Sequence, residues 1–368
     1  MIQTLMRGLN EKNMEAVVRS YDLKDFYYPE LFPMKETYQL TWKSLSAKSG
    51  LRVAADIVAR GASLDPKTRE AVALLQGDIP KTAIMRVKDE NELNEYKMML
   101  AMAGNNVDQK ALVEAWAEDT EYCWNGVAAR LEWMALRQIS LGKITLNNTN
   151  NSSVVSEFDV DYAIDSTHKV GYDSTNSASI ASPSTAKPIS VDFKKMVELA
   201  KSKNDNIKFA WMNLSTFVKF AACEEVIKMS ASFAQNILQV AQTPSVEQVN
   251  TALANLPYLR GLQIIVLDQD ITIELPSGGR TTSNPFEDDV ILFTEGKTLG
   301  QTYWMKPVDM DVTAEPSIKT MHGHTCVKKY AETNPLVEVT MGIANAFPAW
   351  TTAEHSYLLD ATHSSWSH

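Results

Sequence analysis

The sequence predicts an α+β fold in which two packed regions carry two long appendages. A helical pattern of apolar residues runs through 108–141, and short helical and strand-like segments alternate after residue 186. Two strand-like runs, at 51–57 and 83–87, flank a polar crest that has no core of its own. A hairpin alone is barely stable in water, so we expect this one to rest on another surface.

Length and charge limit the classes of function. The 368 residues suffice for two domains, and the net charge of −10 comes from 45 acidic and 35 basic residues. Without a run of Lys and Arg, a general affinity for phosphate backbones is not expected. No apolar run reaches membrane-spanning length. The widely spaced Cys123, Cys223 and Cys326 indicate reduced thiols in a cytosolic setting.

The segment 1–38 is predicted to be an N-terminal arm. A short helical stretch over 9–18 is followed by a segment rich in aromatic residues and broken by Pro29 and Pro33. Its large apolar side chains would be a liability if they stayed exposed. Either a partner surface or the arm's own domain must cover them, and the sequence leaves both open. These side chains are Phe26, Tyr27, Tyr28, Leu31 and Phe32.

The segment 108–141 is the strongest predicted helix. Its core-facing residues recur at steps of three and four, which is the period of a helix with one buried face. Acidic residues crowd its first half and Arg130 and Arg137 fall late, an order that suits the helix dipole. At 1.5 Å per residue it should span roughly 50 Å. The core-facing residues are Leu112, Trp116, Thr120, Cys123, Val127, Leu131 and Met134.

Shorter elements are predicted in the second half of the chain. The Ser/Thr/Asn-rich stretch 165–188 should be an extended surface loop. Asn213 is a good N-cap, and Ser245 with Gln248 forms a capping-box pattern. The expected helices are 191–203, 214–230 and one beginning at Ser245; the expected strands are 207–212, a pair within 262–282 and 288–296 with its turn at Gly278–Gly279, and 336–350.

Two motifs resemble ligand-binding sites, but neither has all the features that such a site requires. The stretch EGKT at 295–298 resembles the end of a phosphate-binding loop, but that loop needs glycine where Ile291 stands and a helix directly afterwards. His322, His324 and Cys326 would face one side of a strand, and zinc needs three or four such ligands. We expect ordinary polar surface there, and no bound metal or cofactor.

An acidic stripe formed by Asp268, Asp270 and Glu274 alternates with apolar residues. A pair of carboxylates could act as general acid and base. Clean alternation is also what a sheet with one wet face shows, and this explains the stripe fully. The sequence therefore gives no catalytic site, and we expect a protein that is not an enzyme.

The stretch from Arg130 to about Val170 resembles the lambda-type family of tailed-phage major capsid proteins (the protein E family). In that family a long helix ends in Arg-x-Glu-x-Met and Leu-Gly-Lys, and a strand carrying Asp-Tyr-Gly follows. The order of parts agrees over most of the chain, roughly Phe32 to Leu359, although Ala163 replaces the glycine. The matching residues are Arg130, Glu132, Met134, Leu141, Gly142, Lys143, Asp161 and Tyr162.

The resemblance implies a Hong Kong 97-type major capsid fold with named parts. These are the N-terminal arm 1–38, the extended E-loop 39–88, the P domain 89–185 with its spine helix 108–141, the A domain 186–324, and the returning strand and C-terminus 325–368, which rejoins the P domain. The implied function is self-assembly, as hexamers and pentamers, into the icosahedral head shell around double-stranded DNA. Expected partners are scaffold, portal and decoration proteins, with DNA enclosed without sequence-specific binding and no membrane. The protein would reside in the virion, after assembly in the host cytoplasm.

In this fold the hairpin would lie on a neighbouring subunit, which explains its lack of a core. We expect an apolar contact face and, at the crest, charges that sit where subunits meet. The residues are Leu51, Val53, Ile57, Ile84 and Val87 on the face, and Lys67, Arg69 and Glu70 at the crest.

Two other functions remain open at this point. Another structural virion protein, such as a tail or decoration component, would usually lack the long helix followed by an A-like domain. A metal-dependent hydrolase would need His322 and His324 together with Asp268 or Asp270.

Overall fold

The fold was analysed in a computed structural model of the chain. It describes residues 3–46, 73–103, 109–147, 150–151, 158–231, 242–259, 261–274, 278–312 and 316–368. The chain forms two compact units, each built from segments that are distant in sequence. Unit 1 contains Met1–Trp42, Gly77–Ala135 and Gln301–Ala349, and unit 2 contains Lys43–Gln76, Leu136–Gly300 and Trp350–His368.

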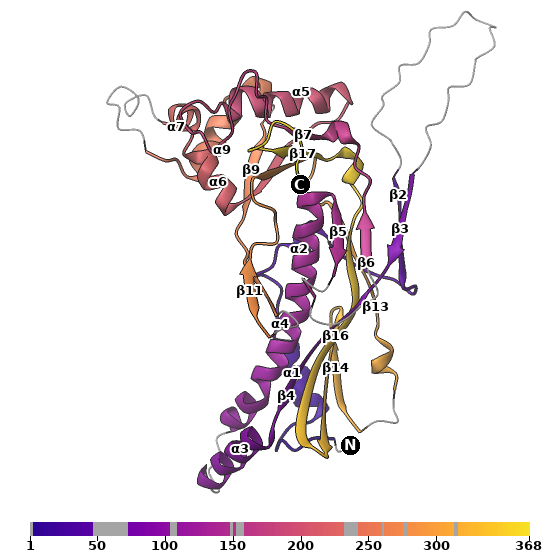
Figure 1. The fold of residues 1–368 in the computed structure, drawn as a ribbon. Helices are drawn as coiled ribbons and strands as arrows, with labels where there is room; N and C mark the ends of the chain where they lie inside the picture. Colours follow the sequence, from indigo (N-terminus) through magenta and orange to yellow (C-terminus); the bar gives the residue numbers. More distant parts are fainter. Residues whose placement is uncertain are drawn as a thin grey trace, which may run out of the picture. The chain divides into compact units, whose positions relative to one another are not determined.

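A mixed sheet organises unit 1. The fifteen-residue strand β16 (Leu336–Trp350) confirms the predicted strand at 336–350. It pairs antiparallel with β15 (Thr325–Thr333) and with β4 (Lys81–Lys88), from Glu338↔Lys88 to Asn345↔Lys81 (Figure 1). The remaining strands of this sheet are β1 (Met34–Glu36), β13 (Gly300–Met305) and β14 (Ile318–His322), in the order β1-β13-β16-β15-β14.

The longest described helix is α4 (Gln109–Leu141), with 33 residues, which confirms the prediction for 108–141. Its part in unit 1 ends at Ala135 and its last turns belong to unit 2. In unit 1, Trp116 and Trp124 of α4 pack with Met14 and Val18 of α1 (Glu11–Val18). The helix α3 (Glu90–Ala103) adds Leu93 and Tyr96 to the same core.

The N-terminal segment is part of unit 1. Tyr28 and Leu31 of α2 (Tyr28–Leu31) and the following Phe32 are buried, and β1 pairs in parallel with β13. Thr302 ties this segment further, because its hydroxyl donates a hydrogen bond to the carbonyl of Phe32 at 2.8 Å. The sequence left open whether a partner or the arm's own domain covers its apolar residues. For Tyr28, Leu31 and Phe32, the arm's own domain covers them.

A five-stranded sheet forms the centre of unit 2. Its order is β7-β17-β12-β8-β9, with β17 and β7 parallel, β8 and β9 parallel, and β12 antiparallel to both neighbours. Helices α5 (Lys194–Ser202), α6 (Leu214–Ala221), α7 (Glu224–Ser230) and α9 (Val246–Ala254) gather around this sheet and share its core (Figure 1). The strands are β7 (Lys169–Gly171), β17 (Tyr357–Asp360), β12 (Val290–Thr294), β8 (Phe209–Asn213) and β9 (Gln263–Leu267).

Several local predictions are confirmed in unit 2, and others are wrong. Asn213 accepts a hydrogen bond from the Thr216 amide at 2.8 Å, and Ser245 forms its capping box with Gln248. The predicted helix 214–230 is instead two helices, because the chain leaves helical geometry at Cys223 before α7. The stretch 165–188 is not simply a surface loop, since it supplies β7 and the buried Ile180 and Ala186.

Three two-stranded sheets complete the described elements. The strand β12 pairs with β8 and β17, so the predicted pairing of 262–282 with 288–296 is wrong. The hairpin in that region is formed within 262–283, between β10 and β11. These sheets are β2 (Thr41–Ser46) with β3 (Ala73–Asp78), β5 (Lys143–Leu146) with β6 (Phe158–Asp161), and β10 (Ile271–Glu274) with β11 (Arg280–Ser283).

Glycine permits the close contact between α4 and the sheet of unit 1. A Cβ atom at Gly342, in the middle of β16, would overlap with the carbonyl group of Cys123 in α4. The Cys123 thiol also donates to the carbonyl of Thr340 at 3.5 Å. One turn later, a Cβ atom at Gly126 would meet the end of the Ile84 side chain of β4 at 2.6 Å. Helix and sheet therefore touch backbone to backbone.

The turn between α4 and the next strands uses two residues in the left-handed region. Gly142 has φ +74° directly after α4, as expected for a helix C-terminal glycine. Ala163 has φ +47°, and the Asp161 carboxylate accepts a hydrogen bond from its amide at 2.8 Å. Between them, the Tyr162 amide donates to the Gly142 carbonyl at 3.1 Å. A side chain is thus tolerated where the family pattern has glycine.

We expect Gly342→Ala to lower the free energy of unfolding by about 2–3 kcal/mol, because the added methyl group meets rigid helix backbone. The matched control is Gly296→Ala, where the nearest atom to an added Cβ lies 3.9 Å away. The control should change stability by less than about 0.5 kcal/mol. Urea denaturation of the purified subunit measures both, and equal stabilities would contradict the close contact.

We expect Ala163→Gly to raise the free energy of unfolding by about 0.5–1 kcal/mol. The left-handed conformation costs an L-residue about 1–2 kcal/mol, and the greater freedom of glycine in the unfolded chain offsets part of the gain. The control is Ala128→Gly in α4, which should lower stability by about 1 kcal/mol because glycine weakens a helix. A loss of stability in the Ala163 variant would show that the turn is not strained.

Candidate functional site

The strand β4 is held in place through one of its faces. Its even-numbered residues are half-buried, and Ile84 lies against Gly126 of α4. The Lys88 ammonium lies 2.8 Å from the Asp119 carboxylate of α4, and the Arg86 guanidinium lies 3.3 Å from the same carboxylate. Asp119 is itself almost fully buried. One carboxylate therefore fixes the end of β4 on the helix.

A buried lysine and a buried glutamate extend this network. The Lys329 ammonium of β15 is buried 3.8 Å from the Asp119 carboxylate and donates to the Thr340 hydroxyl at 2.9 Å. Burial lowers the pKa of Lys329, and the nearby Asp119 acts in the opposite direction. Glu338 of β16 accepts hydrogen bonds from the Thr4 hydroxyl at 2.6 Å and the Leu5 amide at 2.9 Å. The network thus joins the N-terminal segment to the sheet.

The opposite face of β4 is exposed and mostly apolar. We call Ala83, Met85 and Val87 the outer β4 face; Met85 is 56% and Val87 is 41% exposed. Side chains alternate along a strand, so Val87 and Ile84 point to opposite sides. Ile84 and Val87 therefore do not share one face of β4, and whether either contacts a neighbouring copy stays a prediction. Among the described strands, β4 pairs with β16 alone, so no described strand pairs with its other edge.

Of the two runs expected to form the hairpin, 83–87 lies in β4 and pairs with β16, and 51–57 falls outside the described residues. The strands β2 and β3 pair with each other, and residues 47–72 connect them. In this pair, Trp42 is buried and stacks on Phe347 of β16 with ring centroids 5.7 Å apart. The predicted contact residues of the hairpin itself fall outside the described residues: Leu51, Val53, Ile57, Lys67, Arg69 and Glu70.

Of the matched motif residues in α4, Glu132 has the clearest role. Its buried carboxylate accepts hydrogen bonds from the amides of Tyr27 at 3.0 Å and Tyr28 at 2.7 Å, at the start of α2. Burial raises the pKa of Glu132 to about 7, although both hydrogen bonds favour its ionised form. Arg130 lies over the ring of Trp133, 5.2 Å from the centroid, and Met134 is buried.

The other motif residues lie in unit 2 around the end of α4. The Tyr162 hydroxyl is fully buried, donates to the Gln138 side chain at 2.8 Å and accepts from the Trp350 amide at 3.2 Å. Lys143 is exposed and pairs with Asp161 across the β5–β6 ladder. Together with Gly142, these residues shape the connection between α4 and β5. Among the described residues, none of them belongs to a group of metal-type ligands.

The residues suspected of binding metal do not form a site. Gly323, with φ +59°, turns the chain between β14 and β15, so His322, His324 and Cys326 do not follow one strand as expected. His324 is buried with its Nε2 atom 3.4 Å from the Tyr28 hydroxyl, and burial lowers its pKa to about 4. Among the described residues, His322 and His324 belong to no group of metal-type ligands, which weakens the hydrolase alternative.

The EGKT stretch lies in the connection between β12 and β13. All of this stretch except Lys297 lines a cavity of about 240 Å³, together with Thr352, His355 and Ser356. A strand follows this stretch where a phosphate-binding loop requires a helix. The acidic stripe of the sequence is divided between the β9–β10 connection and β10, where Glu274 pairs with Arg280 at 3.6 Å.

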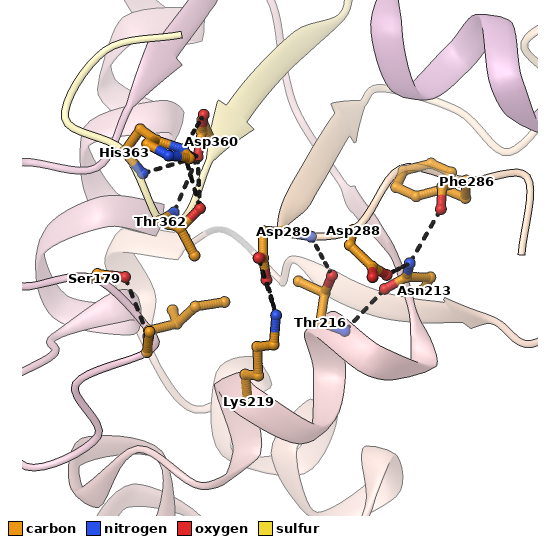
Figure 2. A network of polar contacts seen from close by, with 12 residues as sticks. Ser179, Asn213, Thr216, Lys219, Phe286, Asp288, Asp289, Asp360, Thr362 and His363 are labelled. Carbon is orange, nitrogen blue, oxygen red and sulfur yellow. Dashed lines mark hydrogen bonds and ion pairs between the residues drawn. The ribbon is translucent and has the colours of Figure 1, made fainter. Parts of the chain in front are cut away.

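A polar network in unit 2 orders the start of α6 (Figure 2). The Asn213 side chain, besides capping α6, donates to the Phe286 carbonyl at 3.1 Å and the Asp288 carboxylate at 2.5 Å. The Lys219 ammonium donates to the Asp289 carboxylate at 2.7 Å. This network holds α6 against the entry to β12, while Leu214 and Val218 on α6 remain 42% and 56% exposed.

No protein-family model and no curated protein matches the chain. Solved structures do match. A protein assigned as the capsid protein of a prophage of E. coli CFT073 is 13% identical, with a TM-score of 0.57 and coverage of 96% of this chain and 99% of that chain. A phage-related protein of Bordetella bronchiseptica RB50 is 12% identical over 96% and 97% of the two chains, with a TM-score of 0.49. The mature capsid of bacteriophage PhiM1 gives 9% identity, 92% and 88% coverage, and a TM-score of 0.47.

The prophage protein carries the conclusion, since the match extends over nearly the whole length of both chains. An identity this low speaks to the fold, and the architecture agrees with it: a long helix on a mixed sheet in one unit, and a five-stranded sheet with surrounding helices in the other. The chain therefore has the Hong Kong 97-type fold of phage capsid proteins.

Proposed function

We propose that this chain is a major capsid protein that assembles, as hexamers and pentamers, into the icosahedral head shell of a tailed phage around double-stranded DNA. The single observation that carries the proposal is the fold, which the chain shares over 96% of its length with a prophage protein assigned as a capsid protein. In this role the protein is a building unit, and its function lies in surfaces between copies.

The outer β4 face supports this proposal. An open strand edge with an apolar face is a ready template for association, and a protein that stays monomeric usually protects it. Here Met85 and Val87 are exposed while the opposite face of β4 is fixed by Asp119. A rigid apolar surface of this kind suits repeated contacts in a closed shell.

The paired base of β2 and β3 supports the assignment of 39–88 as an E-loop. Its residues Leu51, Val53, Ile57 and Val87 would contact a neighbour, and Lys67, Arg69 and Glu70 would lie where subunits meet. We assign 1–38 to the N-terminal arm, 89–185 with helix 108–141 to the P domain, 186–324 to the A domain, and 325–368 to the returning strand and C-terminus. Ile84 remains in the proposed contact set, although its half-buried side chain also lies against Gly126 of its own chain.

The charge of the chain fits an enclosure for DNA. With a net charge of −10, the chain is not expected to attract the phosphate backbone strongly, and an inner wall that held the phosphates tightly would impede packaging. We propose scaffold, portal and decoration proteins as further partners, with assembly in the host cytoplasm and residence in the virion. No described helix is long and apolar enough to cross a membrane.

We expect the double substitution Met85→Asp with Val87→Asp to give a folded subunit that does not form shells. Two carboxylates on an apolar contact face would each lose their hydration on association, which is costly unless they are paired. Circular dichroism checks the fold, and sedimentation with electron microscopy of the expressed protein detects shells.

The matched control is Met85→Leu with Val87→Ile, which keeps the same face apolar and should still assemble. Normal shells from the aspartate variant would exclude the outer β4 face as a subunit contact. Failure of the unchanged protein to form shells, even with co-expressed phage head proteins, would contradict the proposed function itself.

A further inference from the structure

The end of the chain folds back on the sheet of unit 2. After Asp360, the last residue of β17, the amide of Tyr172 donates to the carbonyl of His363 at 3.0 Å. Gly171 of β7 allows this approach, because a Cβ atom there would overlap with the backbone of His363 and Ser364. The segment 361–368 is thus seated directly on an edge strand, and its two histidines come back toward Asp360.

Three side chains converge at this place. The Asp360 carboxylate oxygen Oδ2 lies 3.0 Å from His363 Nδ1 and 3.3 Å from His368 Nε2. These three atoms all lie within 4.8 Å of one another, the only such group of metal-type ligands among the described residues. With metal–ligand bonds of about 2.0–2.1 Å, neighbouring ligand atoms of a tetrahedral site lie about 3.3 Å apart. The two separations from Asp360 are therefore close to those of a tetrahedral site.

The carboxylate is oriented by its surroundings. Asp360 is fully buried, and its Oδ1 atom accepts hydrogen bonds from the amides of Thr362 at 3.0 Å and His363 at 2.9 Å (Figure 2). Its Oδ2 atom faces the two imidazoles and also accepts a hydrogen bond from the Ser367 hydroxyl at 2.8 Å. Such fixed orientation of a ligand by hydrogen bonds is typical of metal sites.

His368 supplies a second, independent observation. Its Nε2 atom is buried and has no hydrogen-bond partner among the described residues, although it lies 3.3 Å from the carboxylate. A buried polar atom without a partner costs free energy, so it calls for an occupant. The Trp366 indole donates to the carbonyl of His368 at 2.9 Å and holds the residue in this position.

We propose that Asp360, His363 and His368 bind one divalent transition-metal ion of the zinc type. Two imidazoles and one carboxylate suit Zn²⁺, whereas Mg²⁺ and Ca²⁺ prefer oxygen ligands alone. His363 is more than half exposed, so solvent can reach the ion and water can complete its coordination. The ion would fasten the segment 361–368 to β17 and β7, which is a structural role beyond that of forming a shell.

The test uses the unassembled full-length subunit after removal of metals with a chelator. Titration with zinc chloride in a calorimeter should show one ion per chain. His363→Asn and His368→Asn should each weaken zinc binding by more than about 10-fold, since even the loss of an outer-shell partner costs 10–100-fold. The matched control is His322→Asn in unit 1, which should bind zinc as tightly as the unchanged chain.

Two further readouts separate binding from folding. Added zinc should raise the thermal unfolding midpoint of the unchanged chain and of His322→Asn, and leave that of the double variant His363→Asn with His368→Asn unchanged. Circular dichroism verifies that each variant is folded. Cobalt(II) in place of zinc should give the visible absorption of a four-coordinate ion.

Absence of stoichiometric binding would overturn the proposal, and so would binding that survives in the double variant or disappears in His322→Asn. Each outcome is independent of whether the chain forms shells. Failure of this proposal therefore remains distinguishable from failure of the proposed function.

Discussion

The close contact between α4 and the sheet of unit 1 is the constraint on which the rest of the structure depends. Gly342 lets β16 touch the backbone of α4 at Cys123, and Gly126 gives room to Ile84 of β4 one helical turn later. At this short distance the Asp119 carboxylate reaches Lys88 of β4 and Lys329 of β15. A larger residue at Gly342 would separate helix from sheet and leave Asp119 buried without its partners, which is costly.

This constraint also explains why one face of β4 is free. The contact with α4 uses Ile84, Arg86 and Lys88, which alternate with the residues of the outer β4 face. Alternate side chains point to opposite sides of a strand. When one face of β4 is anchored on α4, its other face therefore points away from the helix. Internal packing and the proposed association thus use different residues of one strand. Substitutions on the outer β4 face can therefore change assembly and leave the subunit folded.

The sequence predicted those parts of the fold that local patterns control. The helix 108–141, the strand 336–350, the N-cap at Asn213 and the capping box at Ser245 depend on periodicity and on neighbours three residues away. The pairing of β4 with β16 joins residues some 250 positions apart, and no local pattern encodes it. Placing Ile84 and Val87 on one face was a different kind of error, because two residues three positions apart on a strand already point to opposite faces.

The ligand clusters show the same limit. His322, His324 and Cys326 were suggested by alternate spacing, but Gly323 has a positive φ and turns the chain between them. The triad of Asp360, His363 and His368 has no strand or helix period, because it forms in an irregular segment folded over Gly171. Its signal in the sequence was a glycine on β7 and two histidines near the end of the chain, and only folding brings these together.

The exposed methionines give the molecule an uneven sensitivity to oxidants. Met85 of the outer β4 face and Met98 and Met102 of α3 are 56%, 55% and 82% exposed, whereas Met14 and Met196 are fully buried. Oxidation turns a flexible apolar thioether into a polar sulfoxide. Peroxide should therefore reach the outer β4 face, the proposed association surface, before it reaches the cores, and damage there would make that surface polar while the fold stays intact. Burial of these thioethers in a contact would protect them from oxidation. The order in which the methionines are oxidised would therefore show which surfaces are covered.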